Sequence, residues 1–374
     1  MQKKYTSLGL MSGTSGDGVD ASIIHSNGRS EFEVIKDRYF EYDSDIFRDI
    51  HNLKEIVGSF KDLNKFSKEL LNLEKKITLF HAKIIQEIYE SKKIDIIGFH
   101  GQTIYHNAKE KISNQLGDGK LLSQLTKKNI VYNFRQNDIE NGGEGAPLTP
   151  IFHQLIANQI KLELPLIILN IGGISNVTIV NSLEDTSKLR SKDIGPGNCM
   201  IDIWVRKNSK LNFDQDGKLA LRGKRNQVIY EQALDLFGNK IMEEETFSLD
   251  VNNFDISFAR GLTLEDGTTT LTDLTAKIIS TSLSLNFSKI KNKFLKVLVC
   301  GGGRKNIFLM KKIKENLSDN ISIQSIDEFG INGDFVESQA FAYLAIRSVL
   351  NLPNSFPGTT GCTRPISGGV IIKY

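Results

Sequence analysis

The chain has 374 residues, enough for two domains that each bury a hydrophobic core. Its 47 Lys and Arg residues nearly balance its 44 Asp and Glu residues, and no dense basic block with interleaved aromatic residues occurs, so nucleic-acid binding is not expected. The three cysteines lie far apart without a C-x-x-C spacing, which predicts free thiols in a reducing compartment. No apolar window approaches the roughly 18 residues of a membrane span and no signal-peptide core is present, so we expect a cytoplasmic protein that binds no membrane.

The first predicted element is a β-hairpin with an unusual turn. The apolar run from Thr6 to Met11 and the alternating run from Val19 to Ile24 predict two strands, and Ser12 to Gly18 between them is rich in glycine and hydroxyl groups. Glycine lets backbone N–H groups approach a phosphate closely, and the carboxylates of Asp17 and Asp20 suit Mg²⁺. Taken alone, the turn is more typical of an ordinary hairpin.

A similar unit returns about 160 residues later. Leu166 to Ile171 and Asn176 to Val180 predict two strands around a turn at Gly172 to Ser175. Leu295 to Cys300 predicts a further strand, which ends in the triplet Gly301 to Gly303. The repetition predicts a duplicated fold and favours phosphate binding by these turns, although no P-loop or G-x-G-x-x-G signature is present.

Amphipathic helices are predicted between these strands. Asp62 to Ser91 keeps apolar residues at a spacing of three or four, and Glu337 to Leu350 predicts another helix. Ile94 to Phe99 predicts a buried strand that ends in His100. Strands mixed with long helices are typical of an α/β protein, here of two domains.

Asp193 is the strongest candidate for a catalytic group. It precedes Gly195, Pro196, Gly197 and Asn198, so a stiff loop is expected to hold its carboxylate ahead of a helix that begins near Asn198. A fixed carboxylate can accept the proton of an attacking hydroxyl or water. The structural alternative is an Asx turn or a helix cap.

Three further polar residues are candidates for substrate binding. Arg135 offers a planar fork to a carboxylate or phosphate, His100 can donate to a substrate oxygen, and Glu337 can contact a sugar hydroxyl. Each also has a structural interpretation: a solvated arginine, a satisfied histidine and an acid that complements a helix dipole.

Together, eight motifs resemble those of the 1,6-anhydro-N-acetylmuramic acid kinases in the same order. They are GLMSGTSGDGVD, GFHGQTIYH, NFRQND…GGEGAPLTPIFH, LNIGGISNVT, DIGPGN…D.W, LVCGGGRKN, ESQAFAYLA and PGTTGC. The resemblance runs from Gly9 to about Cys362, nearly the whole chain.

The resemblance implies the fold of the actin- and hexokinase-like ATPases, a two-domain α/β fold built from duplicated ribonuclease H-like units with the active site in the cleft between the domains. We expect residues 1–135, rejoined by residues 358–374, to form the N-terminal domain and residues 136–357 to form the C-terminal domain. A homodimer is also expected.

The resemblance also implies an activity. The substrate would be 1,6-anhydro-N-acetylmuramic acid, released in peptidoglycan turnover, and the products N-acetylmuramic acid 6-phosphate and ADP. Asp193 would activate the water that opens the 1,6-anhydro bridge, Asp17 and Asp20 would lie on the Mg²⁺ side, and Arg135, His100 and Glu337 would contact the sugar. The residues implied for ATP are Gly13, Thr14, Ser15, Gly16, Asp17, Gly18, Val19, Asp20, Gly172, Gly173, Gly301, Gly302 and Gly303.

Three residues depart from the family pattern: Gly16 replaces a larger apolar residue, Ile194 a threonine and Glu144 a glutamine. Glu144 adds a negative charge near an anionic sugar. Two alternatives stay open, a related kinase for another sugar or carboxylic acid and a nucleotide-binding regulator without chemistry. Retention of Asp193 favours catalysis.

Overall fold

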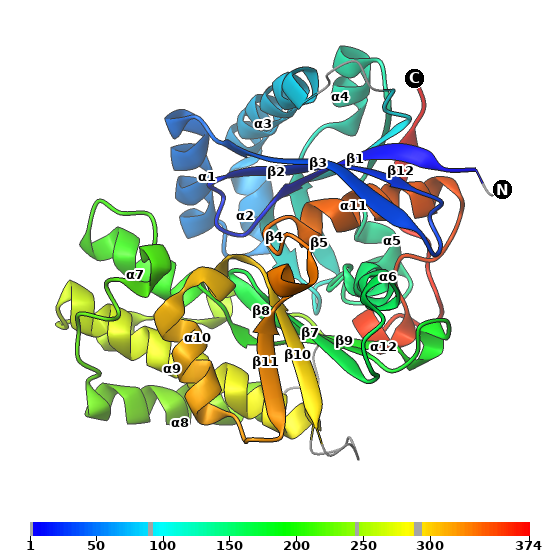
Figure 1. Ribbon diagram of the computed structural model, residues 1–374. Helices are drawn as coiled ribbons and strands as arrows, with labels where there is room; N and C mark the ends of the chain where they lie inside the picture. Colours follow the sequence, from blue (N-terminus) through cyan, green and yellow to red (C-terminus); the bar gives the residue numbers. More distant parts are fainter. Residues whose placement is uncertain (1–2, 89–92, 244–246, 288–293) are drawn as a thin grey trace. The chain divides into compact units, whose positions relative to one another are not determined.

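The structure is a computed structural model and describes residues 3–88, 93–243, 247–287 and 294–374 (Figure 1). The chain divides into two compact units. The first comprises Met1–Leu162, Val180–Ser191 and Asp334–Tyr374, and the second comprises Glu163–Ile179 and Lys192–Gly333. Within the described ranges, every helix is too short or too polar to span a bilayer. All three cysteines are buried free thiols, as predicted.

A mixed β-sheet forms the centre of the first unit. The strands described there are β1 (Tyr5–Ser12), β2 (Gly18–Ser26), β3 (Phe32–Glu41), β4 (Ile96–Asn107), β5 (Ile112–Leu116), β6 (Asn129–Tyr132) and β12 (Val370–Ile372). Their order is β12-β6-β4-β1-β2-β3, with β5 paired to β4. β1, β2 and β3 are antiparallel neighbours, whereas β4 is parallel to both β1 and β6. The predicted first hairpin is therefore confirmed.

Helices cover both faces of this sheet. The helices described in the unit are α1 (Ser44–Ile56), α2 (Phe60–Lys65), α3 (Ser67–Ile88), α4 (Gly119–Thr126), α5 (Gln136–Glu140), α6 (Pro150–Ile160), α11 (Val336–Val349) and α12 (Pro357–Thr360), with a 3₁₀ turn η1 (Thr186–Lys188). Leu8 and Leu10 of β1 share a core cluster with side chains of α1, α3 and α4. Because side chains alternate along a strand, the residue between them faces the opposite side, where α11 lies.

Two glycines allow α11 to lie directly on the sheet. A Cβ atom at Gly9 would stand 1.9 Å from the Ser338 carbonyl oxygen, and one at Gly98 would stand 2.3 Å from that of Phe341. No side chain fits these gaps. The ring of Tyr343 in α11 also packs 5.6 Å from that of Phe152 in α6. These contacts place α6 and α11 in the first unit, so its limits depart from the predicted boundaries at residues 135 and 357.

The second unit repeats the strand order of the first. Its strands are β7 (Leu166–Ile171), β8 (Ile174–Val180), β9 (Arg190–Pro196), β10 (Leu295–Cys300) and β11 (Ile321–Ser325), in the order β11-β10-β7-β8-β9. Only Gly172 and Gly173 join β7 to β8, a link that requires an antiparallel pair. β10 is parallel to β7 and β11, as β4 is to β1 and β6. The predicted duplicated α/β fold is confirmed.

Helices of the second unit pack against its sheet and against one another. They are α7 (Cys199–Asn208), α8 (Gln227–Glu243), α9 (Leu264–Phe287) and α10 (Ile307–Asn316), with 3₁₀ turns η2 (Gln215–Gly217), η3 (Val251–Asn253), η4 (Ser257–Ala259), η5 (Gly302–Lys305) and η6 (Ile326–Phe329). Apolar side chains of α9 and α10 share one core cluster with β7 and β10, and those of α7, α8 and α9 form another.

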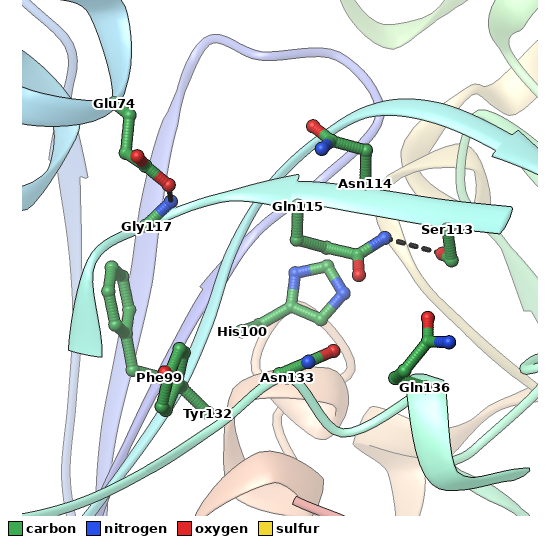
Figure 2. A pocket seen from close by; sticks show the side chains of 10 residues that line it. All are labelled: Glu74, Phe99, His100, Ser113, Asn114, Gln115, Gly117, Tyr132, Asn133 and Gln136. Carbon is green, nitrogen blue, oxygen red and sulfur yellow. Dashed lines mark hydrogen bonds between the residues drawn. The ribbon is translucent and has the colours of Figure 1, made fainter. Parts of the chain in front are cut away.

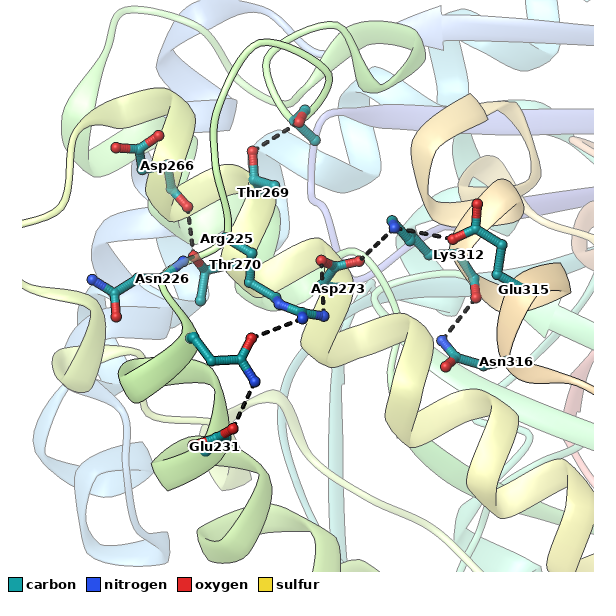
Figure 3. Close-up of polar contacts among 12 residues, drawn as sticks. Arg225, Asn226, Glu231, Asp266, Thr269, Thr270, Asp273, Lys312, Glu315 and Asn316 are labelled. Atoms are coloured by element: carbon teal, nitrogen blue, oxygen red, sulfur yellow. Dashed lines mark hydrogen bonds and ion pairs between the residues drawn. The ribbon is translucent and has the colours of Figure 1, made fainter.

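Ion pairs link α10 to α9. Asp273 of α9 lies 3.5 Å from Arg225 Nη1 and 3.9 Å from Lys312 Nζ of α10, and Lys312 also pairs with Glu315 at 3.0 Å (Figure 3). Burial raises the pKa of Asp273, and the two cations oppose that rise. The network adds a polar link between α9 and α10 to the core cluster that these helices share.

Two predicted elements differ from the observed ones. The helix predicted from Asp62 is split into α2 and α3, because Phe66 leaves helical geometry, and its predicted end at Ser91 lies outside the described residues. The strand predicted to end at Phe99 continues to Asn107, because β5 pairs with it from Gln102 onward. His100 therefore lies within a strand and not at its end.

The close approach of Gly9 to the backbone of α11 leads to a prediction about stability. Gly9→Ala should lower the free energy of unfolding by about 3 kcal/mol, because the added carbon meets helix backbone that cannot rotate away. Gly58→Ala is the matched control: a Cβ there meets no atom within 4 Å, so a change within about 0.5 kcal/mol is expected. Urea denaturation of both variants measures the difference, and equal midpoints would contradict the packing described.

Candidate active site

The turn between β1 and β2 is held by side chains from β4 and α1. Gln102 of β4 is fully buried; its Nε2 donates to Gly13 O at 3.0 Å and its Oε1 lies 2.5 Å from Ser12 Oγ. Lys54 Nζ of α1 donates to Thr14 O at 2.7 Å. These bonds engage carbonyl oxygens on the turn and hold its backbone in one conformation. The stretch predicted to bind ATP phosphates is therefore preorganised.

Gly16 shows why this turn lacks the larger residue usual in the resembling family. Its φ is +63°, in the left-handed region, and its N–H donates to Gly13 O at 3.2 Å. A Cβ here would lie 2.8 Å from Ile50 Cγ2, so Ile50 occupies the space a side chain would need. At Gly13 the nearest atom to a Cβ position is Ser15 Oγ at 3.8 Å, which leaves room above the backbone.

Acidic side chains gather beside the turn. Burial, followed by the charges of Asp17, Glu337, Asp334 and Asp37, raises the pKa of Asp20 to about 8. Asp20 belongs to β2, whereas Glu337 lies in the first turn of α11. The structure thus brings the predicted acids Asp17, Asp20 and Glu337 into one electrostatic environment of strongly negative character.

The donor set fits the predicted Mg²⁺. Asp17 and Asp20 supply carboxylate oxygens, and Mg²⁺ in phosphate-transfer sites usually takes one or two carboxylates while phosphates and water complete its shell. In the described part of the chain, no group of three or more His, Cys, Asp or Glu residues is arranged to hold a metal ion. A divalent cation beside Asp20 would favour the ionised form of its carboxyl group, because the positive charge would offset the charges of the neighbouring acids.

His100 and Arg135, both predicted to contact the sugar, are direct neighbours. Arg135 Nη2 lies 2.8 Å from His100 Nε2, and His100 Nδ1 lies 2.8 Å from Gly101 O. Because a guanidinium only donates, Nε2 must accept, and we assign the ring proton to Nδ1. Burial and then the Arg135 charge hold the pKa of His100 well below its usual range. The histidine is neutral, so the positive charge of the pair is on Arg135.

A cavity of about 240 Å³ adjoins His100 within the first unit. The ring lies among the side chains that line it (Figure 2). Most of them carry neutral hydrogen-bonding groups, and two add aromatic faces, which suits a small polar ligand. The lining residues are Glu74, Phe99, His100, Ser113, Asn114, Gln115, Gly117, Tyr132, Asn133 and Gln136.

Asp193 lies in the second unit, in strand β9 and not in the predicted loop. Its N–H donates to Phe247 O at 2.8 Å, and its Oδ2 accepts from Leu249 N–H at 2.8 Å. Strand β9 is hydrogen-bonded to β8 at the edge of the second sheet, which is why the stretch is extended through Asp193. The Leu249 bond orients the carboxylate, as a general base requires. The neighbouring Ile194 is buried in the core, where an apolar residue in place of threonine fits.

The predicted second phosphate turn is bonded to the start of α7. Gly172 O accepts from Asn198 N–H at 2.8 Å, and Gly173 O accepts from Gly197 N–H at 2.8 Å and from Cys199 N–H at 3.1 Å. Helix α7 begins at Cys199 with Asn198 as its N-cap, as predicted. Because Gly172 N–H itself donates to Ile174 O at 3.2 Å, this turn offers a phosphate fewer amides than its sequence indicates.

The triplet Gly301 to Gly303 is also in the second unit, where hydrogen bonds with neighbouring residues fix its first glycine. Gly301 N–H donates to Gly333 O at 2.9 Å, and Arg304 Nη1 donates to Gly301 O at 3.0 Å. Arg304 forms a bidentate pair with Asp327, and this pairing lowers the pKa of Asp327. The first N–H groups of the short helix η5 have no acceptor within that helix.

Two buried residues that the sequence did not single out support the predicted ones. Gln102 fixes the first turn, and Asp138 of α5 is bonded to the loop next to Arg135. Both stand close to predicted residues in the chain, Gln102 two positions after His100 and Asp138 three positions after Arg135. Their position near His100 and Arg135 in the chain was the one sign in the sequence that these two residues support the site. Their burial could not be predicted from short polar motifs.

The acidic environment predicts how stability changes with pH. Between pH 4 and about 8 the unfolded Asp20 is ionised while the folded one keeps its proton, so rising pH favours unfolding. Asp20→Asn removes this effect, so its thermal midpoint minus that of the unmodified protein should increase from pH 4 to pH 8 in metal-free buffer. The exposed Asp319→Asn is the control, with a flat difference expected. A constant difference for Asp20→Asn would contradict the assigned electrostatics.

Comparison with known proteins identifies the family. A family model described as anhydro-N-acetylmuramic acid kinase matches residues 5–374. A protein of that name from Pelagibacter ubique (strain HTCC1062) is 55% identical over 375 residues, the full length of both chains. Another, from Zymomonas mobilis subsp. mobilis (strain ATCC 31821 / ZM4 / CP4), is 36% identical and covers 97% of this chain and 98% of its own. This chain belongs to the anhydro-N-acetylmuramic acid kinase family.

Proposed function

We propose that this protein is an ATP-dependent kinase that opens the 1,6-anhydro ring of 1,6-anhydro-N-acetylmuramic acid and phosphorylates O6. The products are N-acetylmuramic acid 6-phosphate and ADP, and the setting is peptidoglycan recycling. The family match over residues 5–374, with 55% identity to a full-length relative of that name, carries the proposal. The same resemblance is the ground for expecting a cytoplasmic homodimer.

ATP would be bound by the glycine turns. Room above Gly13 and the fixed backbone of the first turn support a role for Gly13 to Asp20 in holding phosphates. The second turn and the triplet Gly301 to Gly303 are proposed to complete the nucleotide site. Bound Mg²⁺, held by Asp17 and Asp20, would neutralise charge on the phosphates.

Asp193 would act as the general base. A water molecule attacks C1 as the C1–O6 bond breaks, and Asp193 takes the proton of that water. The released O6 then takes the γ-phosphoryl group, and ADP leaves. The bond from Leu249 N–H supports this role, because it fixes the orientation of the carboxylate.

The sugar would be held by charged residues of the first unit. Arg135 presents a guanidinium beside the neutral His100, which suits the lactyl carboxylate of the substrate. Glu337 is proposed to accept from a sugar hydroxyl at the start of α11. Glu144 places its carboxylate on the loop next to Arg135, where it would weaken the affinity for an anionic sugar.

Isotope labelling tests the reaction. The protein incubated with Mg-ATP, the anhydro sugar and ¹⁸O-water should release ADP and a 6-phosphosugar that carries ¹⁸O at the anomeric carbon. Mass spectrometry of the sugar and of inorganic phosphate separates the outcomes. Label in phosphate alone indicates ATP hydrolysis, and the absence of turnover points to the alternative substrates or to a regulator.

A substitution tests the assigned base. Asp193→Asn should lower kcat by about 10²- to 10⁴-fold, because the amide cannot accept the proton, while the Kd for ATP stays nearly unchanged. Asp202→Asn, in the first turn of α7, removes a nearby carboxylate that the reaction does not use and serves as control. Steady-state kinetics and calorimetric titration of ATP give both quantities. A large loss of ATP affinity in Asp193→Asn would show that the residue serves nucleotide binding instead.

A further inference from the structure

Asp138 is a buried carboxylate that the proposed reaction does not use. It lies in α5, three residues after Arg135, and only 1% of its surface is exposed. Its Oδ2 accepts from Gly145 N–H at 2.8 Å, and its Oδ1 accepts from Thr360 Oγ1 at 2.7 Å and from Ser355 Oγ. A buried charge that collects three donors is held in one position.

Gly145 connects this carboxylate to Arg135. The N–H of Gly145 donates to Asp138, and its carbonyl oxygen accepts from Arg135 Nη1 at 2.8 Å. The Arg135 guanidinium therefore donates to a carbonyl oxygen, that of Gly145, whose position is fixed by the Asp138 carboxylate. Arg135 Nη2 meets His100 Nε2 at 2.8 Å, so the two terminal nitrogens of the fork are oriented by Gly145 and His100.

The loop around Gly145 is anchored on both sides. Gly143 N–H donates to Asp138 O at 2.9 Å, and Glu144 N–H donates to Thr360 O at 2.8 Å. A Cβ at Gly145 would lie 2.8 Å from Ile139 Cδ1, which shows how closely the loop approaches α5. Loss of the Asp138 charge would free this loop at its centre.

We propose that Asp138 is a positioning residue that sets the direction of the Arg135 guanidinium toward the lactyl carboxylate of the sugar. The inference rests on the proposed function, in which Arg135 binds that carboxylate. Bidentate recognition needs a planar fork in a fixed orientation. A displacement of about 1 Å in a group that orients a substrate can cost roughly 10²-fold in rate.

A double-mutant cycle tests the energetic link. Asp138→Asn should lower kcat/KM for the anhydro sugar by about 10- to 100-fold, chiefly through KM, and leave the KM for ATP unchanged. Arg135→Ala should show a loss at least as large, and adding Asp138→Asn to it should change little more, because the positioned group is already absent. Glu140→Gln removes an exposed carboxylate from the same helix and should match the unmodified protein.

Nitrogen NMR of the His100 ring tests the positioning without substrate. In the unmodified protein we expect a proton on Nδ1 and the shift of a hydrogen-bonded acceptor at Nε2. Asp138→Asn should move the Nε2 shift toward the value in Arg135→Ala, and Glu140→Gln should not. An unmoved Nε2 shift in a folded Asp138→Asn protein would overturn the inference.

The two readouts separate the two proposals. If the unmodified protein does not turn over the sugar, the proposed function fails, and the ring shifts still decide whether Asp138 positions Arg135. If turnover occurs but the losses of Asp138→Asn and Arg135→Ala simply multiply, Asp138 has a structural role alone. Should Asp138→Asn not fold, Thr360→Val and Ser355→Ala each remove one donor to the carboxylate and should give smaller shifts in the same direction.

Discussion

The close packing of α11 on the first sheet is the constraint that places Glu337 among the acidic side chains of the first unit. Gly9 and Gly98 let carbonyl oxygens of the helix approach where any side chain would collide. Ser22 and Ser338, 316 positions apart, then meet at 2.6 Å. The first turn of α11 is thereby fixed beside β2, which is why the charge of Glu337 raises the pKa of Asp20.

In each unit, backbone carbonyl oxygens of a glycine turn accept hydrogen bonds. These bonds fix the turns that carry candidate site residues. In the first unit, Gln102 and Lys54 bind carbonyl oxygens of the β1–β2 turn. In the second, Gly172 and Gly173 accept from the start of α7, which directly follows β9 and its Asp193. Within that unit, a proposed nucleotide turn and the proposed base therefore belong to one hydrogen-bonded assembly.

Local patterns predicted much of this arrangement. The strands around both glycine turns, the start of α7 near Asn198 and the helix beginning at about Glu337 were predictable, because alternation, capping residues and helical spacing are local properties. The end of β4 was not, since it depends on pairing with β5. The limits of the two units were not predictable either. They depend on which sheet a helix distant in the sequence, such as α11, covers.

The sequence by itself determined the duplicated α/β organisation, the family and the residue types at the candidate site, because these reside in ordered motifs and in local periodicity. Only the tertiary structure decided the electrostatic state of those residues: the raised pKa of Asp20, the neutral ring of His100 and the buried carboxylate of Asp138. Burial and the approach of charges from distant segments control these states, and neither quantity is contained in a short motif.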